Sequence, residues 1–165
     1  IDHIPETYLL EMALDDIGIK ERHIIQATPW HLVKGSITLF SGETITFPIT
    51  ESKLKEIEFY YFGGAIEFED LKEDKRVPGV DKRLILIRPT EDGHIEEDIT
   101  GRESQVSKLL NISIDIVRER SQVLNRRDRI GRTGVYLNRR LMLDESFEQV
   151  LKEISDKDSN VRRRG

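Results

Sequence analysis

The sequence predicts an α+β fold, in which an N-terminal helix and an antiparallel strand-rich module precede two short helices joined by a tight turn. Three observations lead to this prediction: a helical pattern of apolar residues near the start, alternating patterns in the middle, and two short helical patterns joined by a tight turn near residue 111. The 165 residues suffice for one large domain or two small ones. Composition changes near 89–99, which predicts an acidic α+β module, 1–95, a basic module, 96–155, and a flexible tail, 156–165.

The first predicted element is an amphipathic helix over residues 5–17. Pro5 suits the first turn of a helix, and Gly18 suits the position that follows its last turn. We expect the buried face of this helix to consist of Tyr8, Leu9, Met12, Ala13 and Ile17.

Strands are predicted after this helix. The segments SITLF and TITFPI enclose Gly42 and predict one hairpin, and Pro48 marks a strand end or a sheet edge. The segments IEFYYF and AIEFEDL predict a second hairpin that turns at Gly63 and Gly64. RLILIR, residues 83–88, is a candidate for a buried strand. The basic module ends in a helix over 144–155, with Phe147, Val150, Leu151 and Ile154 on one face.

Residues 100–125 predict two short helices and a three-residue turn. Thr100 and Glu103 have the spacing of a capping box, which would begin the first helix. Asn111 tolerates the left-handed conformation that often ends a helix, and Ser113 is a candidate N-cap for the second helix. The first helix would bury Val106, Leu109 and Leu110, and the second would bury Ile116, Val117, Val123 and Leu124. The second helix would then expose Asp115, Arg118, Glu119, Gln122 and Asn125, as expected for a helix that lies in the major groove of DNA.

The run SQVSKLLNISIDIVRERSQVL resembles the helix-turn-helix core of bacterial and archaeal transcription regulators. The stretch that follows, DRIGRTGVYLNRRLML, resembles the β-hairpin wing of the winged version, with Gly131 and Gly134 at its bends. The resemblance covers about 45 of the 165 residues. A winged domain normally has an apolar helix before the pair, whereas 84–99 has the pattern of a strand and an acidic loop. The resemblance implies a sequence-specific DNA-binding protein, such as a transcriptional regulator.

Charge is distributed unevenly along the chain, although the net charge is only −5. Residues 1–100 contain 11 Lys and Arg against 21 Asp and Glu, whereas 101–141 contain 10 against 4. Nine of those ten positive residues are arginines, whose planar guanidinium binds phosphate or a guanine edge. A basic segment of this kind indicates a polyanionic partner. The other interpretation is that these arginines pair with the carboxylates of the acidic half.

Roles on double-stranded DNA follow from this interpretation. Arg118 and Gln122, one helical turn apart, are expected to face base edges, and Asp115 to accept from a cytosine amine. Phosphate contacts are expected from Ser113, Arg126, Arg127, Arg129 and Arg132. Bound as a homodimer to six to ten phosphates, the protein would lose about 10³-fold or more in affinity between 50 and 200 mM salt. The acidic module would provide dimerisation or sense a small-molecule effector.

Other classes of function find less support in the sequence. The chain has no cysteine, no signal-peptide pattern and no apolar run near the ~20 residues of a membrane span, so a cytoplasmic location is expected. Its four histidines lack the spacing of metal ligands. No nucleophile or acid–base pair stands out, so we expect no cofactor and do not expect an enzyme.

Two enzyme-like alternatives remain open, and both take residues 112–140 as strands. In the first, IDIVRER and GVYLNRRLML would project arginines into a tunnel, as in a triphosphate-tunnel phosphohydrolase or cyclase, although the alternating-glutamate signature of those enzymes is absent. In the second, the order of sequence blocks resembles chorismate-lyase-like proteins that hold a carboxylated ligand. Arg118, Arg132 and Glu145 would then bind the ligand, although the middle of this chain is shorter than that family requires.

Overall fold

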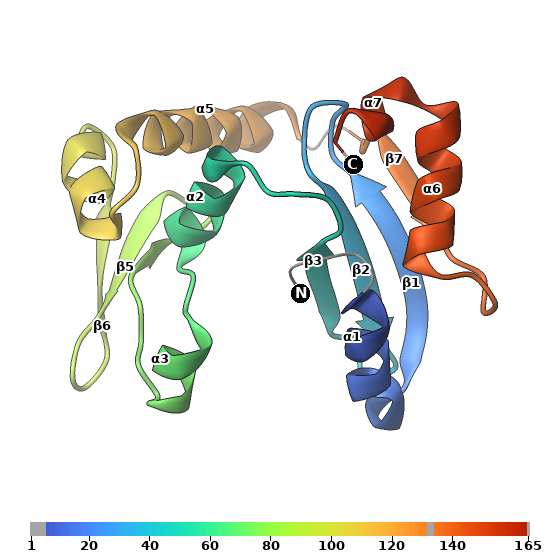
Figure 1. The fold of residues 1–165 in the computed structure, drawn as a ribbon. Coiled ribbons are helices and arrows are strands. Elements are labelled where there is room, and N and C mark those ends of the chain that lie inside the picture. Colours follow the sequence, from blue (N-terminus) through green and yellow to red (C-terminus); the bar gives the residue numbers. More distant parts are fainter. Residues whose placement is uncertain (1–5, 132–133, 165) are drawn as a thin grey trace. The chain divides into compact units, whose positions relative to one another are not determined.

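The computed structural model describes residues 6–131 and 134–164 and divides the chain into two compact units. Residues 1–52 and 133–165 belong to one unit, which we call the four-stranded unit, and residues 53–132 belong to the other, the three-stranded unit. The second unit is therefore inserted into the sequence of the first (Figure 1). The α+β class is confirmed. The division into units differs from the predicted modules, since residues 95 and 96 both lie in the three-stranded unit.

The four-stranded unit consists of one antiparallel sheet and its helices. In chain order its elements are α1 (Thr7–Leu14), the 3-10 helix η2 (Asp15–Ile17), β1 (Ile19–Gln26), β2 (Val33–Leu39), β3 (Thr44–Pro48), β7 (Leu137–Arg140), α6 (Phe147–Lys157) and α7 (Ser159–Arg162). The strand order is β3-β2-β1-β7. The hairpin predicted around Gly42 is confirmed as β2 and β3, and β3 ends at Pro48 on the edge of the sheet.

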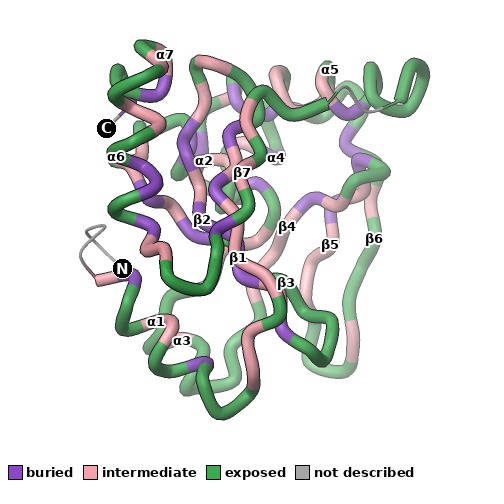
Figure 2. Tube along the Cα trace, turned by 90° about the vertical axis from the view of Figure 1, so that its right-hand side faces the viewer, coloured by how far each residue is buried: buried purple, intermediate pink, exposed green. Residues whose placement is uncertain are grey.

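The core of this unit lies between α6 and the sheet. Phe147 is fully buried, and its ring meets that of Phe47 edge to face, with centroids 5.3 Å apart. Buried residues follow β2 and the inward side of α6 (Figure 2). The helix predicted at 144–155 is thus confirmed with slightly later bounds. The tail predicted as flexible is wrong in part, because 159–162 form α7 and Val161 is fully buried.

The predicted buried face of α1 is wrong. Thr7 and Leu14 are buried, whereas Tyr8, Leu9, Met12 and Ile17 are each at least half exposed and Ala13 is exposed. The ion pair between Glu11 and Arg22 of β1, 2.6 Å long, places Glu11 toward the sheet. The spacing of apolar residues in the helix could not reveal which side faces the sheet, because Arg22, the partner of Glu11, lies in β1.

The three-stranded unit packs four helices with a small antiparallel sheet of order β4-β5-β6. Its elements are α2 (Leu54–Gly63), α3 (Phe68–Lys72), β4 (Gly79–Val80), β5 (Ile85–Pro89), β6 (His94–Asp98), α4 (Glu103–Leu110) and α5 (Ile114–Ile130). The predicted strand 83–88 is confirmed as β5 with slightly later bounds, and Leu84 just before it and Leu86 within it are buried. The core joins α2, β4, β5, α4 and α5 and includes Phe62, Val80, Leu86, Ile99, Val106, Leu110, Ile116 and Val117.

The second predicted hairpin is wrong, because its two segments form the helices α2 and α3. The Glu56 carboxylate accepts the backbone N–H of Lys53 at 2.9 Å, which satisfies a free donor at the start of α2. Gly63 and Gly64 end this helix instead of turning a hairpin, and Gly64 has φ +94°. The backbone of Gly79 lies so close to them that a Cβ there would be 2.7 Å from Gly63.

The predicted wing is also wrong. The helix α5 continues to Ile130, and Gly131 follows with φ +79°. Among the described residues the next strand is β7, which pairs with β1 of the four-stranded unit, with His23 opposite Arg140, instead of with an adjacent strand of a hairpin. Arg132 lies outside the described residues.

Both enzyme-like alternatives disagree with the structure, each for a different reason. IDIVRER lies within a helix of 17 residues, so it cannot line a tunnel of strands. The blocks compared with chorismate-lyase-like proteins fall in two separate sheets, since β5 pairs with β4 and β6, whereas β2 and β7 both pair with β1. Glu145 is held by Arg139 at 2.7 Å and by the N–H of Met142.

Candidate nucleic-acid interface

Two helices and a three-residue turn form the candidate interface, as the sequence predicts. Asn111 follows α4 in the left-handed conformation, with φ +52°. The Ser107 hydroxyl donates to the carbonyl of Ile112 at 2.8 Å and fixes the turn. Ser113 is extended, with ψ 144°, and is the N-cap of α5. Short polar side chains thus bend the chain between two helices whose apolar residues share one core.

The start of α4 differs from the predicted capping box. The helix begins at Glu103, and Arg102 occupies the cap position instead of Thr100. The Glu103 carboxylate accepts the N–H of Gly101, whereas the N–H of Thr100 donates to Asp98. The carboxylate still satisfies a free donor at the helix start, one residue later than expected.

The buried faces of the helix pair are close to the prediction. Val106 and Leu110 of α4 and Ile116, Val117 and Leu124 of α5 are buried, as expected. The exceptions are Leu109, which is 45 % exposed, and Val123, which is only partly buried. The burial of α5 is concentrated in its first three turns, and residues 125–130 are all exposed (Figure 2).

Opposite the core, α5 presents a polar face that we call the α5 stripe. It consists of Asp115, Arg118, Gln122, Arg126 and Arg129, all exposed and separated by three or four residues. At 3.6 residues per turn, this spacing keeps them on one side of the helix. Arg126 and Arg129 also lie in the last turns, where positive charge interacts favourably with the helix dipole.

Arg127 is exposed but does not belong to the stripe. It follows Leu124 by three residues and Arg120 by seven, which places it on the side of the helix that faces the core in earlier turns. Its charge contributes to lowering the pKa of Arg120, as expected for neighbours on one face. The larger cause of that lowered pKa is the partial burial of Arg120 itself.

The sequence interpretation missed the support that α2 gives to α5. Glu58 accepts both the N–H and the hydroxyl of Ser113, at 2.8 and 2.9 Å. The guanidinium of Arg120 lies over the ring of Phe59, 4.8 Å from its centroid. Helical periodicity in 54–63 was the signal that could have revealed this face, but the aromatic run IEFYYF favoured a strand.

The basic segment is divided between paired and unpaired arginines. Arg102 pairs with Glu97 at 3.1 Å, Arg139 with Glu145 at 2.7 Å and Arg140 with Glu21 at 3.9 Å, so the pairing interpretation holds for these three. Within residues 6–131 and 134–164, neither Arg118 nor Arg126 has a carboxylate within 4.0 Å, and Arg129 bonds only the carbonyl of Asn125. The stripe therefore keeps three arginines available to a ligand.

Comparison with known proteins gives no match: no protein-family model matches the chain, and neither a curated protein nor a solved structure is significantly similar to it. The resemblance of α4 and α5 to transcription regulators thus remains a prediction. Among the described residues, no three His, Asp or Glu side chains are arranged to hold a metal ion. None of the helices within the described ranges has the length and apolar character needed to cross a membrane.

Proposed function

We propose that the protein binds double-stranded DNA through the α5 stripe. The observation that supports this most is the exposed row of Arg118, Gln122, Arg126 and Arg129 on a helix whose opposite side is anchored in a core. An α-helix fits the major groove of B-DNA, and Arg and Gln are the side chains that bond guanine and adenine edges there. The helix pair would present this face as a rigid unit.

The roles of individual residues follow from their position along α5. Arg118 and Gln122 lie in the middle of the helix and would contact base edges, with Asp115 close to them. Arg126 and Arg129 lie near its end and would contact phosphates, as would Arg127 from the side of the helix that faces the core in earlier turns. The Glu58 carboxylate accepts the N–H and the hydroxyl of Ser113, and its charge would repel a phosphate. The phosphate contact expected of Ser113 is therefore not part of this proposal.

This mode of binding would be simpler than that of a winged domain. Since β7 pairs with β1 in the sheet of the four-stranded unit, the contacts proposed here come from one helix per chain, and a homodimer would double their number. The four-stranded unit would provide dimerisation or sense an effector. A DNA-binding role would place the protein in the cytoplasm, in contact with the chromosome.

Fluorescence anisotropy with a labelled 30-base-pair random duplex tests the proposal. If Arg126, Arg127 and Arg129 each neutralise one phosphate, affinity falls roughly 40-fold per chain between 50 and 200 mM salt. Absence of binding at 50 mM salt would overturn the proposal.

Single substitutions separate base contacts from phosphate contacts once a preferred sequence has been selected. We expect Arg118→Ala to weaken binding to the selected sequence by about 1–3 kcal/mol and to reduce discrimination, whereas Arg126→Ala weakens all sequences alike. Arg83→Ala is the matched control, because Arg83 is an exposed arginine of the same unit that lies in the turn between β4 and β5 and pairs with Asp81. Equal losses for all three variants would show that α5 is not the binding surface.

A further inference from the structure

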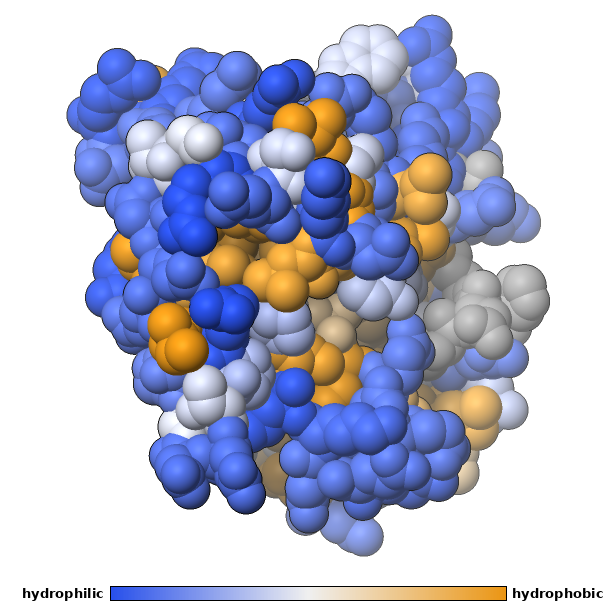
Figure 3. Space-filling model, turned by 90° about the vertical axis from the view of Figure 1, so that its left-hand side faces the viewer, coloured by the Kyte–Doolittle hydropathy of each residue, from blue (hydrophilic) through white to orange (hydrophobic). Residues whose placement is uncertain are grey.

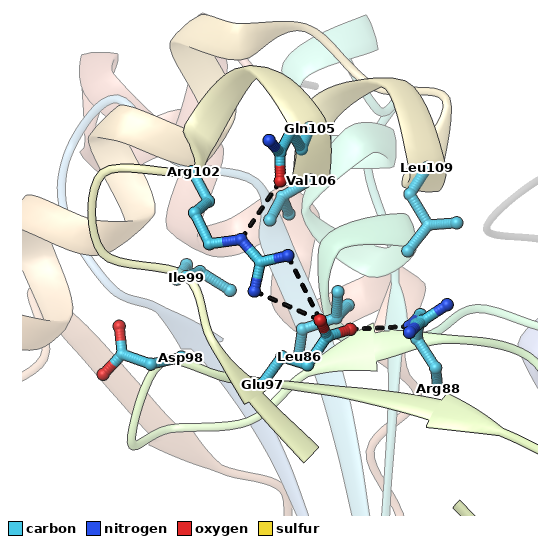
Figure 4. A pocket seen from close by; sticks show the side chains of 9 residues that line it. All are labelled: Leu86, Arg88, Glu97, Asp98, Ile99, Arg102, Gln105, Val106 and Leu109. Atoms are coloured by element: carbon cyan, nitrogen blue, oxygen red, sulfur yellow. Dashed lines mark hydrogen bonds and ion pairs between the residues drawn. The ribbon is translucent and has the colours of Figure 1, made fainter. Parts of the chain in front are cut away.

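A pocket of about 260 Å³ opens between the sheet and α4, entirely within the three-stranded unit. Leu86, Val106 and Leu109 supply apolar walls, and Arg88, Glu97 and Arg102 supply charged groups (Figure 4). Figure 3, which shows the side of the molecule that carries β6 and α4, displays apolar groups at its centre within a hydrophilic rim. The pocket thus combines apolar surface with a small number of polar groups, as ligand sites do.

Glu97 holds the two arginines in place from opposite sides. Arg88 donates through Nε to one carboxylate oxygen at 2.7 Å, and Arg102 donates through both terminal nitrogens to the other at 3.1 Å. Gln105 accepts the Nε–H of Arg102 at 3.1 Å. In the described part of the chain, no group bonds the two terminal nitrogens of Arg88. These donors are therefore oriented but unused.

The charges of the pocket favour one kind of anion. Arg88, Arg102 and Glu97, which bond one another, carry a net charge of +1, and Asp98 brings the charged lining of the pocket to zero. A monoanion bound near Arg88 would therefore be tolerated better than a dianion. Asp98 also lines the pocket, but its carboxylate accepts the N–H of Thr100 and points away from Arg88 in Figure 4. At about 30 Å³ per water-sized group, the pocket accommodates roughly nine non-hydrogen atoms.

We propose that this pocket binds a small monocarboxylate with an apolar body, with the carboxylate on the terminal nitrogens of Arg88 and the apolar body against Leu86, Val106 and Leu109. Arg binds carboxylates through two parallel N–H donors, which is the geometry that these nitrogens offer. Leu109, 45 % exposed, stands at the opening and would be covered by the ligand. The inference does not depend on DNA binding, because the stripe and the pocket involve different residues.

Benzoate, which has the required size and charge, is the probe. Titration of the full chain with sodium benzoate, followed by amide and side-chain NMR, is expected to give saturable shifts at Leu86, Arg88, Val106 and Leu109. Benzyl alcohol, which lacks the charge, and phosphate, which lacks the apolar body, are expected to bind at least about tenfold more weakly. Equal binding of either compound, or no saturable shift with benzoate, would overturn the proposal.

Two variants test the assigned contacts. Arg88→Gln is expected to weaken benzoate binding at least tenfold, with Arg83→Gln as a control that leaves it unchanged. Because Arg88→Gln also removes a bond to Glu97, Leu109→Glu provides a test that leaves the ion pairs intact: it places a negative charge at the opening on an exposed helical position and is expected to abolish binding. Benzoate binding that persists in Leu109→Glu, with the fold retained, would show that the ligand lies elsewhere.

Discussion

The three-stranded unit consists of one continuous segment of the chain, whereas the four-stranded unit consists of two segments from opposite ends of it. The three-stranded unit is built from one continuous stretch, 53–132, and its helix pair follows local signals in the sequence. The four-stranded unit is completed by β7, which pairs Leu137 with Gln26 and so joins the two ends of the chain. The three-stranded unit thus forms from segments that are close in the sequence, whereas the four-stranded unit requires two strands that are far apart in the sequence to pair. Substitutions that act on one unit alone can test this difference.

The largest effect is expected from Phe147→Ala. This side chain is fully buried between α6 and the sheet, and its removal is expected to destabilise the four-stranded unit by about 3–5 kcal/mol. Denaturant titration followed by amide NMR would show whether the three-stranded unit keeps its signals while the other unit unfolds. A single shared transition for residues of both units would contradict the idea that they are stabilised separately.

Gly79→Ala is expected to act on the three-stranded unit instead. A Cβ at Gly79 would lie 2.7 Å from backbone atoms of Gly63 and Gly64, so β4 and the end of α2 must separate. We expect a loss of about 1–3 kcal/mol, measured by urea denaturation. Gly93→Ala is the control, because the nearest atom to a Cβ there is 4.0 Å away. Equal stability of both variants would show that this close approach does not matter.

Glu58→Ala tests the link between α2 and α5. It removes the acceptor for both donors of Ser113 and is expected to cost about 1 kcal/mol, as the loss of a helix cap does. Hydrogen exchange at the first amides of α5 should rise in the variant. Unchanged exchange there would mean that water replaces the carboxylate without loss.

The smallest effect is expected from acid. The hydrogen bond from Arg102 is the largest cause that lowers the pKa of Glu97 below its ordinary 4.5. Burial opposes it, and the hydrogen bond from Arg88 and the charges of both arginines keep the net direction downward. A carboxylate with a lowered pKa contributes stability above pH 4.5, and this contribution is lost as the pH falls through the lowered value. Glu97→Gln should therefore flatten the acid dependence of the urea midpoint of the three-stranded unit between pH 5 and 3, whereas Glu91→Gln, at an exposed site, should not. The same slope in both variants would contradict this assignment.

Local signals explain which parts of the fold could be predicted. Asn111 and Ser113 indicate a turn by their own backbone preferences, and the apolar spacing of Ile116 and Val117 fixes the buried side of α5, so the helix pair could be found from the sequence. The hairpin around Gly42 could be found for the same reason.

The elements that could not be predicted from the sequence depend on partners elsewhere in the chain. β1 was missed because Lys20, Arg22 and Gln26 interrupt its apolar pattern, although Gln26 is fully buried and donates to the carbonyl of His31. The partner of β7 could not be inferred, because strand pairing leaves no local mark in GVYLNRR. At the candidate site, the stripe followed from spacing, but the role of Glu58 required α2 to be recognised as a helix.

The insertion of one unit into the other has a consequence for how the protein is made. When β1, β2 and β3 leave the ribosome, the outer edge of β1 has no partner, because the strand that covers it begins at Leu137. At about 5–20 residues per second, roughly 5–20 s pass between the synthesis of Gln26 and that of Leu137. During this time the backbone of β1, with the apolar Ile24 and Ile25, is available to a neighbouring nascent chain. The three-stranded unit is synthesised in this interval, so the four-stranded sheet cannot be completed until all residues of that unit have been made.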